Sequence, residues 1–506
     1  MINMEKSKVQ CKTPNIYGYK GFAIRFSIIA VLTALMSVAF CRSRIGAAVL
    51  VGMQCIVLLV LFIKKSYIEY LCVYLLFMTL SLEYSYYYET DIYGFKMFKL
   101  FGISIGTWCI LPVFVVALIN IKFLLEYRFS KKNQLAYFVW GIIFINLIGL
   151  IMGIYQISIN DNGVRDIPGV WNAFFAEVYA FTMLVLIPIY TFFYYVIRYQ
   201  DEIVKLKISL LLIMVAIIVM QIFSAATPFK GTSWEQTTLL VPLAYMFSPF
   251  VIIFCMYFKN RYIQFAAIAL GVLGLFFSIK YTVSSGGILM ICLIPVTILL
   301  KLLQSGKRKE FFWGVVFCIV GVILFYFCMT IDIPADTRVG YKLIQARSIF
   351  KIWDKQWIAS MPNSARFRFL ELQNILEEYV RKPYYFLFGK GIMGTCLDYS
   401  GAFKMTYSIG GAFTDLEWIY DVYYSVHETI NVMLLNNGLL GMCVVVYVFT
   451  RYFKYVYKSP FLAIGFAWFL FDYTYSFTLS MFGIMCLLVG LYDIQLLDGK
   501  KEWQLI

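Results

Sequence analysis

Residues 364–394 read SARFRFLELQNILEEYVRKPYYFLFGKGIMG, and residues 426–441 read VHETINVMLLNNGLLG with His427, the only histidine of the chain. In the first stretch Ser364 is a suitable N-cap, apolar residues follow at helical spacing, and Pro383 ends the run. We therefore predict an amphipathic helix, of the kind that can lie on a membrane surface. Both stretches fall within or beside a long polar segment, residues 331–427.

Around that segment the chain is apolar enough to indicate an integral membrane protein. Hydrophobic side chains make up 62% of its 506 residues and charged ones 14%. Apolar runs of about 20 residues recur along it, and such runs cross a bilayer as helices because lipid offers the backbone no hydrogen bonds. We predict an all-α protein with fourteen spans, at residues 21–41, 45–63, 66–82, 100–121, 135–155, 173–197, 207–223, 239–258, 262–279, 286–303, 311–330, 428–450, 459–474 and 478–497.

The positions of the basic residues predict the orientation of these spans. With the N-terminus in the cytoplasm, the segments on the cytoplasmic side carry 24 Lys and Arg residues, and the short outer loops carry seven. That asymmetry follows the positive-inside rule, so both termini are expected in the cytoplasm. The chain then divides into eleven spans in residues 1–330, one large outer loop in residues 331–427, and three spans with a cytoplasmic C-terminus in residues 428–506.

The charge pattern also separates the large loop from other kinds of segment. Eleven basic and ten acidic residues are mixed within it, together with aromatic residues, so we expect a structured cap rather than a linker. Elsewhere the basic residues form short clusters between apolar runs and no continuous face, so the formal charge of +15 does not indicate nucleic-acid binding. Twelve cysteines include no C-x-x-C pair and the chain has one histidine, so neither a disulfide framework nor a zinc site is indicated. We expect no metal and no other cofactor.

Polar residues inside the apolar runs mark a possible cavity under the loop. Glu177, Lys280 and Asp472 all fall near predicted outer ends, on the side of the large loop. Ionisable groups are costly inside a membrane and usually face a polar cavity there.

Basic and glycine residues in the loop could bind phosphate groups. Arg366 and Arg368 open the predicted helix, Arg381 closes it, and Gly389 and Gly391 follow. Arginine binds phosphate in a bidentate manner, and glycine allows the main chain to approach it. The alternative is a solvated basic edge followed by a glycine turn.

His427 and Glu428 lie at the outer mouth of the twelfth predicted span. An imidazole titrates near neutral pH and can accept a proton from a hydroxyl group. A single histidine can equally serve as a structural residue.

Short motifs in the C-terminal half of the chain occur in a characteristic order. Four motifs, together with the His-x10-Gly spacing from His427 to Gly438, resemble the outer-loop signature of the O-antigen polymerase and ligase superfamily. The motifs are Ser364-Ala365-Arg366, Phe388-Gly389-Lys390-Gly391, Val426-His427-Glu428-Thr429 and Asn437-Gly438-Leu439-Leu440-Gly441. Residues Thr282 to Gly286 also resemble the T-x-S-R-G motif of that family, although Ser285 replaces its arginine, and Glu428 stands where asparagine is common.

This resemblance implies a GT-C-like glycosyltransferase in the bacterial cytoplasmic membrane. It would transfer a growing glycan from undecaprenyl diphosphate to the next lipid-linked repeat unit on the outer face. Arg366 would bind the diphosphate, and His427 would activate the acceptor or orient the diphosphate, with Arg368, Lys280 and Arg381 as supporting cations. The expected partners are the lipid-linked oligosaccharide, membrane lipids and a chain-length regulator protein.

Two other functions fit the same pattern. A ligase that transfers finished glycan to the lipid A core belongs to the same superfamily. A polysaccharide flippase, from a different class, would also have about a dozen spans with buried charges. Transporters usually show internal repeats with short loops, and this chain has one long asymmetric loop and no detectable repeat, so the enzyme is favoured.

Overall fold

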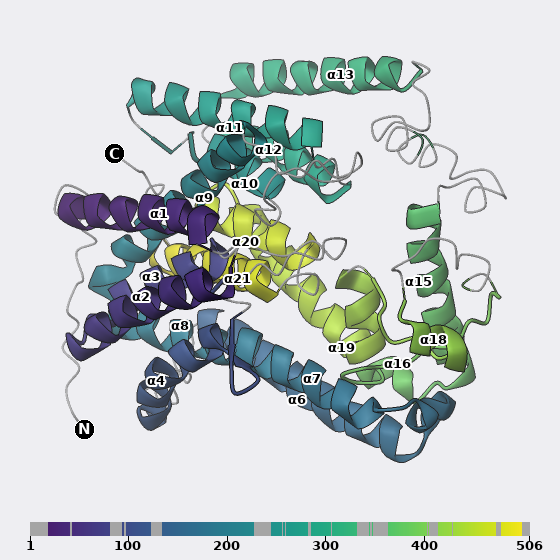
Figure 1. Ribbon diagram of the computed structural model, residues 1–506. Coiled ribbons are helices and arrows are strands. Elements are labelled where there is room, and N and C mark those ends of the chain that lie inside the picture. The colour runs from purple at the N-terminus through teal and green to yellow at the C-terminus, as the bar shows by residue number, and fades with distance from the viewer. Residues whose placement is uncertain are drawn as a thin grey trace, which may run out of the picture.

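The structure of the chain is a computed structural model (Figure 1). The residues it describes are 19–40, 43–80, 94–95, 98–122, 134–226, 244–255, 257–258, 260–281, 285–304, 306–330, 344, 347, 363–401, 403, 413–427, 429–471 and 477–497.

Helices dominate the described residues, as predicted. Each of the fourteen predicted stretches contains a helix: α1 Lys20–Phe40, α2 Arg44–Ile63, α3 Tyr67–Thr79, α4 Ile105–Ile119, α6 Gln134–Ser158, α7 Val170–Phe181 with α8 Ile187–Arg198, α9 Ile203–Ala226, α10 Ala244–Cys255, α11 Arg261–Tyr281, α12 Ser285–Gln304, α13 Arg308–Thr330, α19 Thr429–Tyr452, α20 Pro460–Phe471 and α21 Phe477–Leu497. A π-helical turn, Thr182–Leu186, joins α7 to α8. The fourth stretch begins with two short paired strands, β1 Lys99–Leu100 and β2 Ile103–Ser104, which the sequence analysis did not predict.

Among the described residues, five helices are long and apolar enough to cross a membrane by themselves: Lys20–Ser37, Arg44–Ile63, Leu135–Ser158, Gln200–Met220 and Ile430–Tyr455. Their surfaces suit lipid. On α2, Leu50 and Leu58 are buried, whereas Ile45 is 81% exposed and Ile63 is 69% exposed. Such exposed aliphatic side chains would be unfavourable in water, and they are what a lipid-facing helix requires.

The main core lies between α3, α8, α9, α10, α20 and α21. Glycines let α20 and α21 approach closely: a Cβ on Gly465 would lie 2.5 Å from Leu487 Cα, and one on Gly490 would lie 2.6 Å from Leu462 Cα. Small residues at helix crossings are the usual way to pack helices in a membrane, because close backbone contact replaces the hydrophobic effect.

Polar contacts join several helices at one end of this core. Tyr19 Oη donates to the Asp201 carbonyl at 2.8 Å, and Lys205 Nζ lies 2.9 Å from Glu69 Oε1. A buried ion pair joins Lys207 of α9 to Asp493 of α21, and Ser459 Oγ donates to the same carboxylate at 2.8 Å. These contacts bring together the first residues of α1, α3 and α9 and the last turns of α21.

A smaller unit lies beside the far ends of α6, α7 and α19 (Figure 1). It contains α15 Asn363–Arg381, α16 Tyr385–Phe388 and α18 Asp415–Tyr420. In this view α15 runs across the direction of α1 and α13. We call this unit, residues 363–427 as far as they are described, the cap. Its core is aromatic and includes Phe367, Phe403, Phe413 and Tyr423, packed on Leu434 and Leu435 of α19. A structured cap was predicted, and α15 matches the predicted amphipathic helix.

Candidate functional site

His427 is held by a buried carboxylate that the sequence analysis did not select. Its Nδ1 lies 2.6 Å from Oε1 of Glu371, and its backbone amide donates to Glu371 Oε2 at 3.0 Å. Asn431 Nδ2 donates to the same Oε2 at 3.0 Å. Glu371 is fully buried, whereas the side chain of His427 is 22% exposed. The pair therefore has a buried half and an accessible half.

This geometry determines the histidine tautomer. A carboxylate only accepts hydrogen bonds, so Nδ1 carries the proton that is donated to Glu371, and the lone pair of the neutral ring is on Nε2. The ring also meets Phe367 edge-on, with centroids 5.7 Å apart, and Phe413 at 6.1 Å. Two hydrogen bonds to one buried carboxylate and two aromatic neighbours orient the imidazole as a general base requires.

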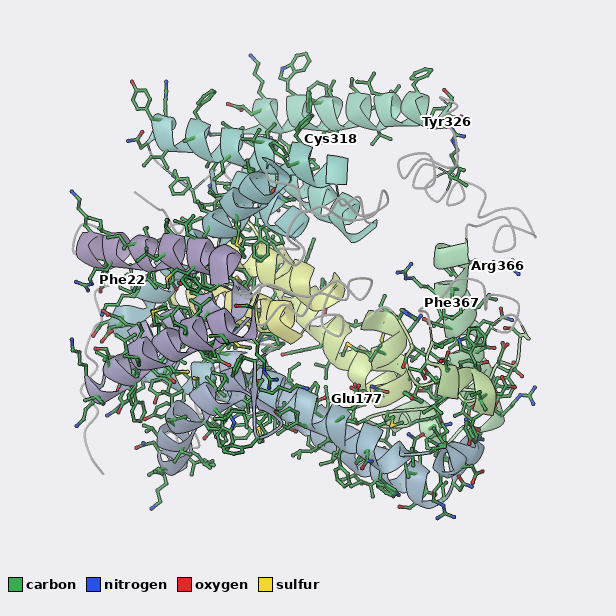
Figure 2. The ribbon with its side chains drawn as sticks, viewed as in Figure 1. Phe22, Glu177, Cys318, Tyr326, Arg366 and Phe367 are labelled. Carbon is green, nitrogen blue, oxygen red and sulfur yellow. The ribbon has the colours of Figure 1, made fainter. Side chains whose placement is uncertain are left out.

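The two arginines that open α15 lie on different sides of it. An α-helix turns by about 100° per residue, so Arg368 lies about 60° from Glu371 around the axis, and Arg366 lies about 140° away. The carbonyl of Arg368 accepts a hydrogen bond from Asn431 Nδ2 at 3.0 Å. The helix register therefore places Arg368 closer than Arg366 to the side of α15 that faces His427. Arg366 is half-buried at the start of α15 (Figure 2), and its Nε has no hydrogen-bond partner among the described residues.

Arg381 lies far from this pair. It follows Glu371 by ten residues on the same helix, which corresponds to about 15 Å along the axis. Its Nε bonds to Glu377 Oε1 at 3.0 Å, and its guanidinium stacks 4.4 Å from the Tyr399 ring centroid. Arg381 thus lies at the end of α15, about 15 Å along the axis from the residue that contacts His427, and the structure does not bring Arg381 and His427 to one site.

The glycines of the predicted phosphate loop pack against other helices. Gly389 has φ +73° and Gly391 has φ +85°, and a Cβ on Gly391 would lie 2.0 Å from the Gly153 amide nitrogen of α6. Their amides donate to backbone carbonyls, Gly389 to Tyr385 at 2.7 Å and Gly391 to Asn436 at 3.0 Å. The loop also meets Gly438, where α19 is interrupted at φ +57°. In this conformation the glycines fasten the cap to α6 and α19.

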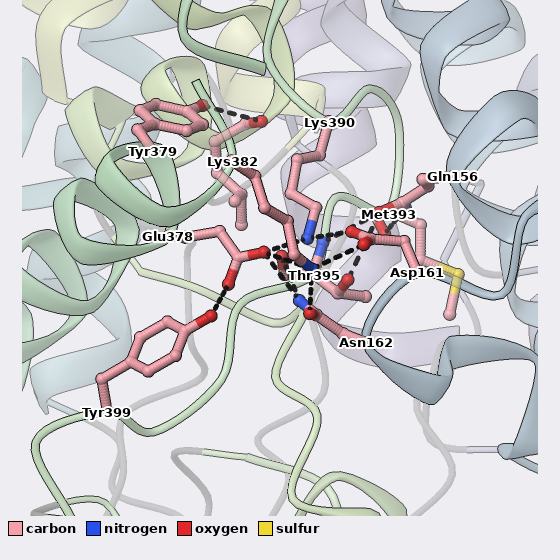
Figure 3. A network of polar contacts seen from close by, with 11 residues as sticks. Gln156, Asp161, Asn162, Glu378, Tyr379, Lys382, Lys390, Met393, Thr395 and Tyr399 are labelled. Atoms are coloured by element: carbon pink, nitrogen blue, oxygen red, sulfur yellow. Dashed lines mark hydrogen bonds and ion pairs between the residues drawn. The ribbon is translucent and has the colours of Figure 1, made fainter. Parts of the chain in front are cut away.

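Beside those glycines lies a cluster of four charged side chains, three of them buried and that of Lys382 partly exposed, shown in Figure 3. Lys390 Nζ lies 2.7 Å from Glu378 Oε1 and 2.5 Å from Asp161 Oδ2, and Lys382 Nζ lies 2.5 Å from Asp161 Oδ1. Tyr399 Oη donates to Glu378 Oε2 at 2.5 Å. We call these four charges, Asp161, Glu378, Lys382 and Lys390, the Lys390 cluster. It is electrically neutral and joins the cap to the turn after α6.

Burial and charge act in opposite directions on the pKa values of this cluster. Burial would raise the pKa of Glu378, but Lys390, Tyr399 and Lys382 outweigh it and hold that pKa below its usual value. Burial would lower the pKa of Lys382, but its bonds to Asp161 and Glu378 raise it instead. Cys396 in the same unit is fully buried, and burial raises the pKa of its thiol. Glu378 and Lys382 are therefore ionised at neutral pH, and the thiol is protonated.

The remaining predicted positions are only partly described. Lys280 lies in the last turn of α11, but its side chain is outside the described residues, as are Glu428 and Asp472. Glu177 is exposed on α7 (Figure 2), and its neighbours Phe174 and Val178 pack against Val422 and Tyr424 of the cap. Glu177 therefore lies on the side of the molecule that carries the cap. In the described part of the chain no three His, Cys, Asp or Glu residues converge as a metal site would need.

Of the two groups that were not predicted, Glu371 carries no local sequence signal, whereas the Lys390 cluster carries one. Glu371 is one of several acidic residues in α15, and nothing local distinguishes it from Glu377. Lys390 between two glycines, and the turn residues Asp161-Asn162-Gly163, were the available signals for the Lys390 cluster.

No protein-family model, curated protein or solved structure matches the chain.

Proposed function

We propose that this protein is a membrane glycan transferase of the O-antigen polymerase type, acting on undecaprenyl-diphosphate-linked repeat units. The observation that carries the proposal is the contact between accessible His427 and fully buried Glu371, at 2.6 Å. A histidine oriented in this way by a carboxylate is a typical general base for a hydroxyl nucleophile. The motif order described above supports the choice of a lipid-linked glycan as substrate.

The chemistry assigns a role to each half of the pair. His427 Nε2 would accept the proton of the acceptor hydroxyl as that oxygen attacks the anomeric carbon of the donor glycan. The bond from that carbon to the diphosphate breaks, and undecaprenyl diphosphate leaves with the electron pair. Glu371 would stabilise the imidazolium that forms. The negative charge on the leaving group calls for cations, and we assign this role to Arg368 first and to Arg366 second, because of their positions around α15.

The fourteen-span topology with an outer cap is part of this proposal, and the long-range contacts support it. Gln156, Asp161 and Asn162, from a predicted outer loop, all contact the predicted outer cap. Contacts at the opposite end, including Tyr19 to Asp201 and Lys207 to Asp493, join segments that are all predicted to be cytoplasmic or next to the cytoplasm. Contacts that joined predicted outer and inner segments would have argued against this arrangement.

The test is complementation of a strain that lacks the chain. Wild-type protein and the control Ile419→Ala, an exposed residue of α18, should restore long glycans, whereas His427→Ala should lower polymerisation by about 10²–10⁴-fold at normal expression. Gel analysis of glycan length and mass spectrometry of the lipid-linked glycans provide the measurement. Normal chain lengths with His427→Ala would overturn the catalytic role.

The lipid-linked species that accumulates in the deletion strain distinguishes the other functions. Single repeat units on the outer face support a polymerase. Full-length glycans that stay on the lipid carrier would indicate a ligase, and repeat units that remain on the cytoplasmic face would indicate a flippase.

A further inference from the structure

Helix α15 exposes apolar side chains on one side and buries polar side chains, together with apolar ones, on the other. Its buried side carries Glu371, Asn374 and Glu378, all with 0% exposure. Its exposed side carries Phe369 at 40%, Leu376 at 46% and Val380 at 75%, with Gln373 as the exposed polar residue between them. Val380 lies nine residues after Glu371, which places the two about 180° apart around the helix.

The exposed apolar side continues beyond α15. In α16, Phe386 is 46% exposed, Leu387 is 46% exposed and Phe388 is 38% exposed. This helix packs against α6, where Ile151 is 65% exposed and Tyr155 is 46% exposed. Since α6 is one of the helices apolar enough to cross a membrane, the exposed apolar side of the cap adjoins a helix suited to lipid.

Charges on α15 fit an anionic lipid surface. Arg381 is 56% exposed beside the apolar residues, and Arg366 and Arg368 are half-buried at the other end of the helix. Glu377, the acidic residue of α15 that is not buried, pairs with Arg381. Interfacial helices typically combine aromatic and aliphatic side chains on one side with Arg or Lys at its border, where these bind lipid phosphates.

We propose that the exposed side of α15 and α16 is inserted into the outer leaflet, at the boundary between headgroups and acyl chains. We call this side, Phe369, Leu376, Val380, Phe386, Leu387 and Phe388, the apolar stripe. Its occupant is the lipid bilayer. The alternatives are a second copy of the chain and a segment of the same chain, and the continuity with α6 favours lipid over both.

The stripe has a consequence for the site, and this step rests on the proposed function. Glu371 faces away from the stripe, so lipid bound on one side of α15 would leave the His427–Glu371 pair on the other. Insertion of the stripe would thus fix the pair at headgroup depth, where the diphosphate of a lipid-linked substrate lies. Lipid contact is measured without any activity assay. The proposal of lipid contact can therefore fail while the proposed function stands, and the proposed function can fail while lipid contact is observed.

The experiment compares two equally exposed positions of the cap. Val380 is 75% exposed on the stripe, and Ile419 is 72% exposed on α18, outside it. The full chain carrying Val380→p-benzoylphenylalanine or Ile419→p-benzoylphenylalanine is placed in nanodiscs of phosphatidylethanolamine and phosphatidylglycerol, irradiated, and analysed by mass spectrometry. We expect about fivefold more lipid adduct at position 380 than at position 419.

Leu376→p-benzoylphenylalanine provides a second probe on the stripe, because this side chain is also exposed and can change without disturbing the core. It should behave like position 380. Equal lipid adduct at positions 380, 376 and 419 would overturn the proposal. So would crosslinks from position 380 mainly to a second copy or to residues 331–362.

Discussion

The His427–Glu371 pair and the Lys390 cluster are both built from charged groups of the cap, but they differ in how completely those groups are used. In the Lys390 cluster each charge meets an opposite charge, and Lys390 and Glu378 are fully buried. In the pair the carboxylate is fully buried and the imidazole reaches the surface. The cluster is thus suited to holding the cap in place, and the pair to meeting a substrate.

Location explains the difference. The Lys390 cluster joins two parts of the chain, α15 with its following loop and the turn after α6, so a missing charge there would leave another charge buried alone. The pair joins α15 to the segment just before α19, and its imidazole is partly exposed. Predictions about the two regions therefore concern different quantities, stability for the cluster and rate for the pair.

The largest expected effect is on the stability of the cap. Lys390→Met removes a fully buried charge and leaves Asp161 and Glu378 with one cation between them, so we expect a loss of about 3–5 kcal/mol. Thermal unfolding in detergent, with limited proteolysis of the cap, provides the measurement. A variant as stable as wild type would mean that the four charges do not hold the cap.

The next effect is on rate. Glu371→Gln keeps the shape of the side chain but removes the charge that supports the imidazolium, so polymerisation should fall by about 10²-fold with little change in unfolding temperature. Chain-length analysis with the matched variant Glu377→Gln, an exposed neighbour on α15, gives the comparison. Equal activity of the two variants would show that Glu371 has no special role in the reaction.

A smaller effect concerns pH and the cluster. Because the folded pKa of Glu378 is held below its usual value of 4.5, its contribution to stability is present above pH 4.5 and is lost as pH falls through the folded pKa. The raised pKa of Lys382 implies a contribution present below pH 10.5 and lost at higher pH. The contributions of these two groups should thus stay constant between these limits.

Unfolding temperatures measured from pH 3 to pH 7 test the acidic side, using wild type and Glu378→Gln. The wild type should lose stability below about pH 4.5 more steeply than the variant, which has no charge to lose at this position. Parallel curves for the two proteins would contradict the assignment.

The smallest effect is expected at Arg381. Its side chain is 56% exposed and pairs with Glu377 one helical turn away, an arrangement that contributes about 0.3–0.5 kcal/mol. Arg381→Ala should therefore leave both unfolding temperature and glycan length close to wild type, unlike Arg368→Ala, which should shorten the glycans. Strong loss of activity with Arg381→Ala would indicate that Arg381 binds the diphosphate, as the sequence predicted.

Much of the fold follows from patterns that lie within short stretches of the sequence. Apolar runs predicted a helix at each of fourteen stretches, because backbone hydrogen bonds in lipid must be satisfied within a segment. The amphipathic spacing after Ser364 predicted α15. The paired strands before α4 were missed, since two-residue strands carry no periodic signal.

The sequence by itself singled out His427 as the only histidine, and it showed basic and glycine residues in the loop that precedes it. Only the tertiary structure decided which groups meet. Glu371 is 56 residues from His427, and Asp161 is 221 residues from Lys382, and no local pattern encodes such pairings. Helix register places Arg366 and Arg368 on different sides of α15. Close packing against α6 and α19 gives Gly389 and Gly391 a structural role. Side-chain neighbours are set by how whole helices pack, which depends on the complete chain.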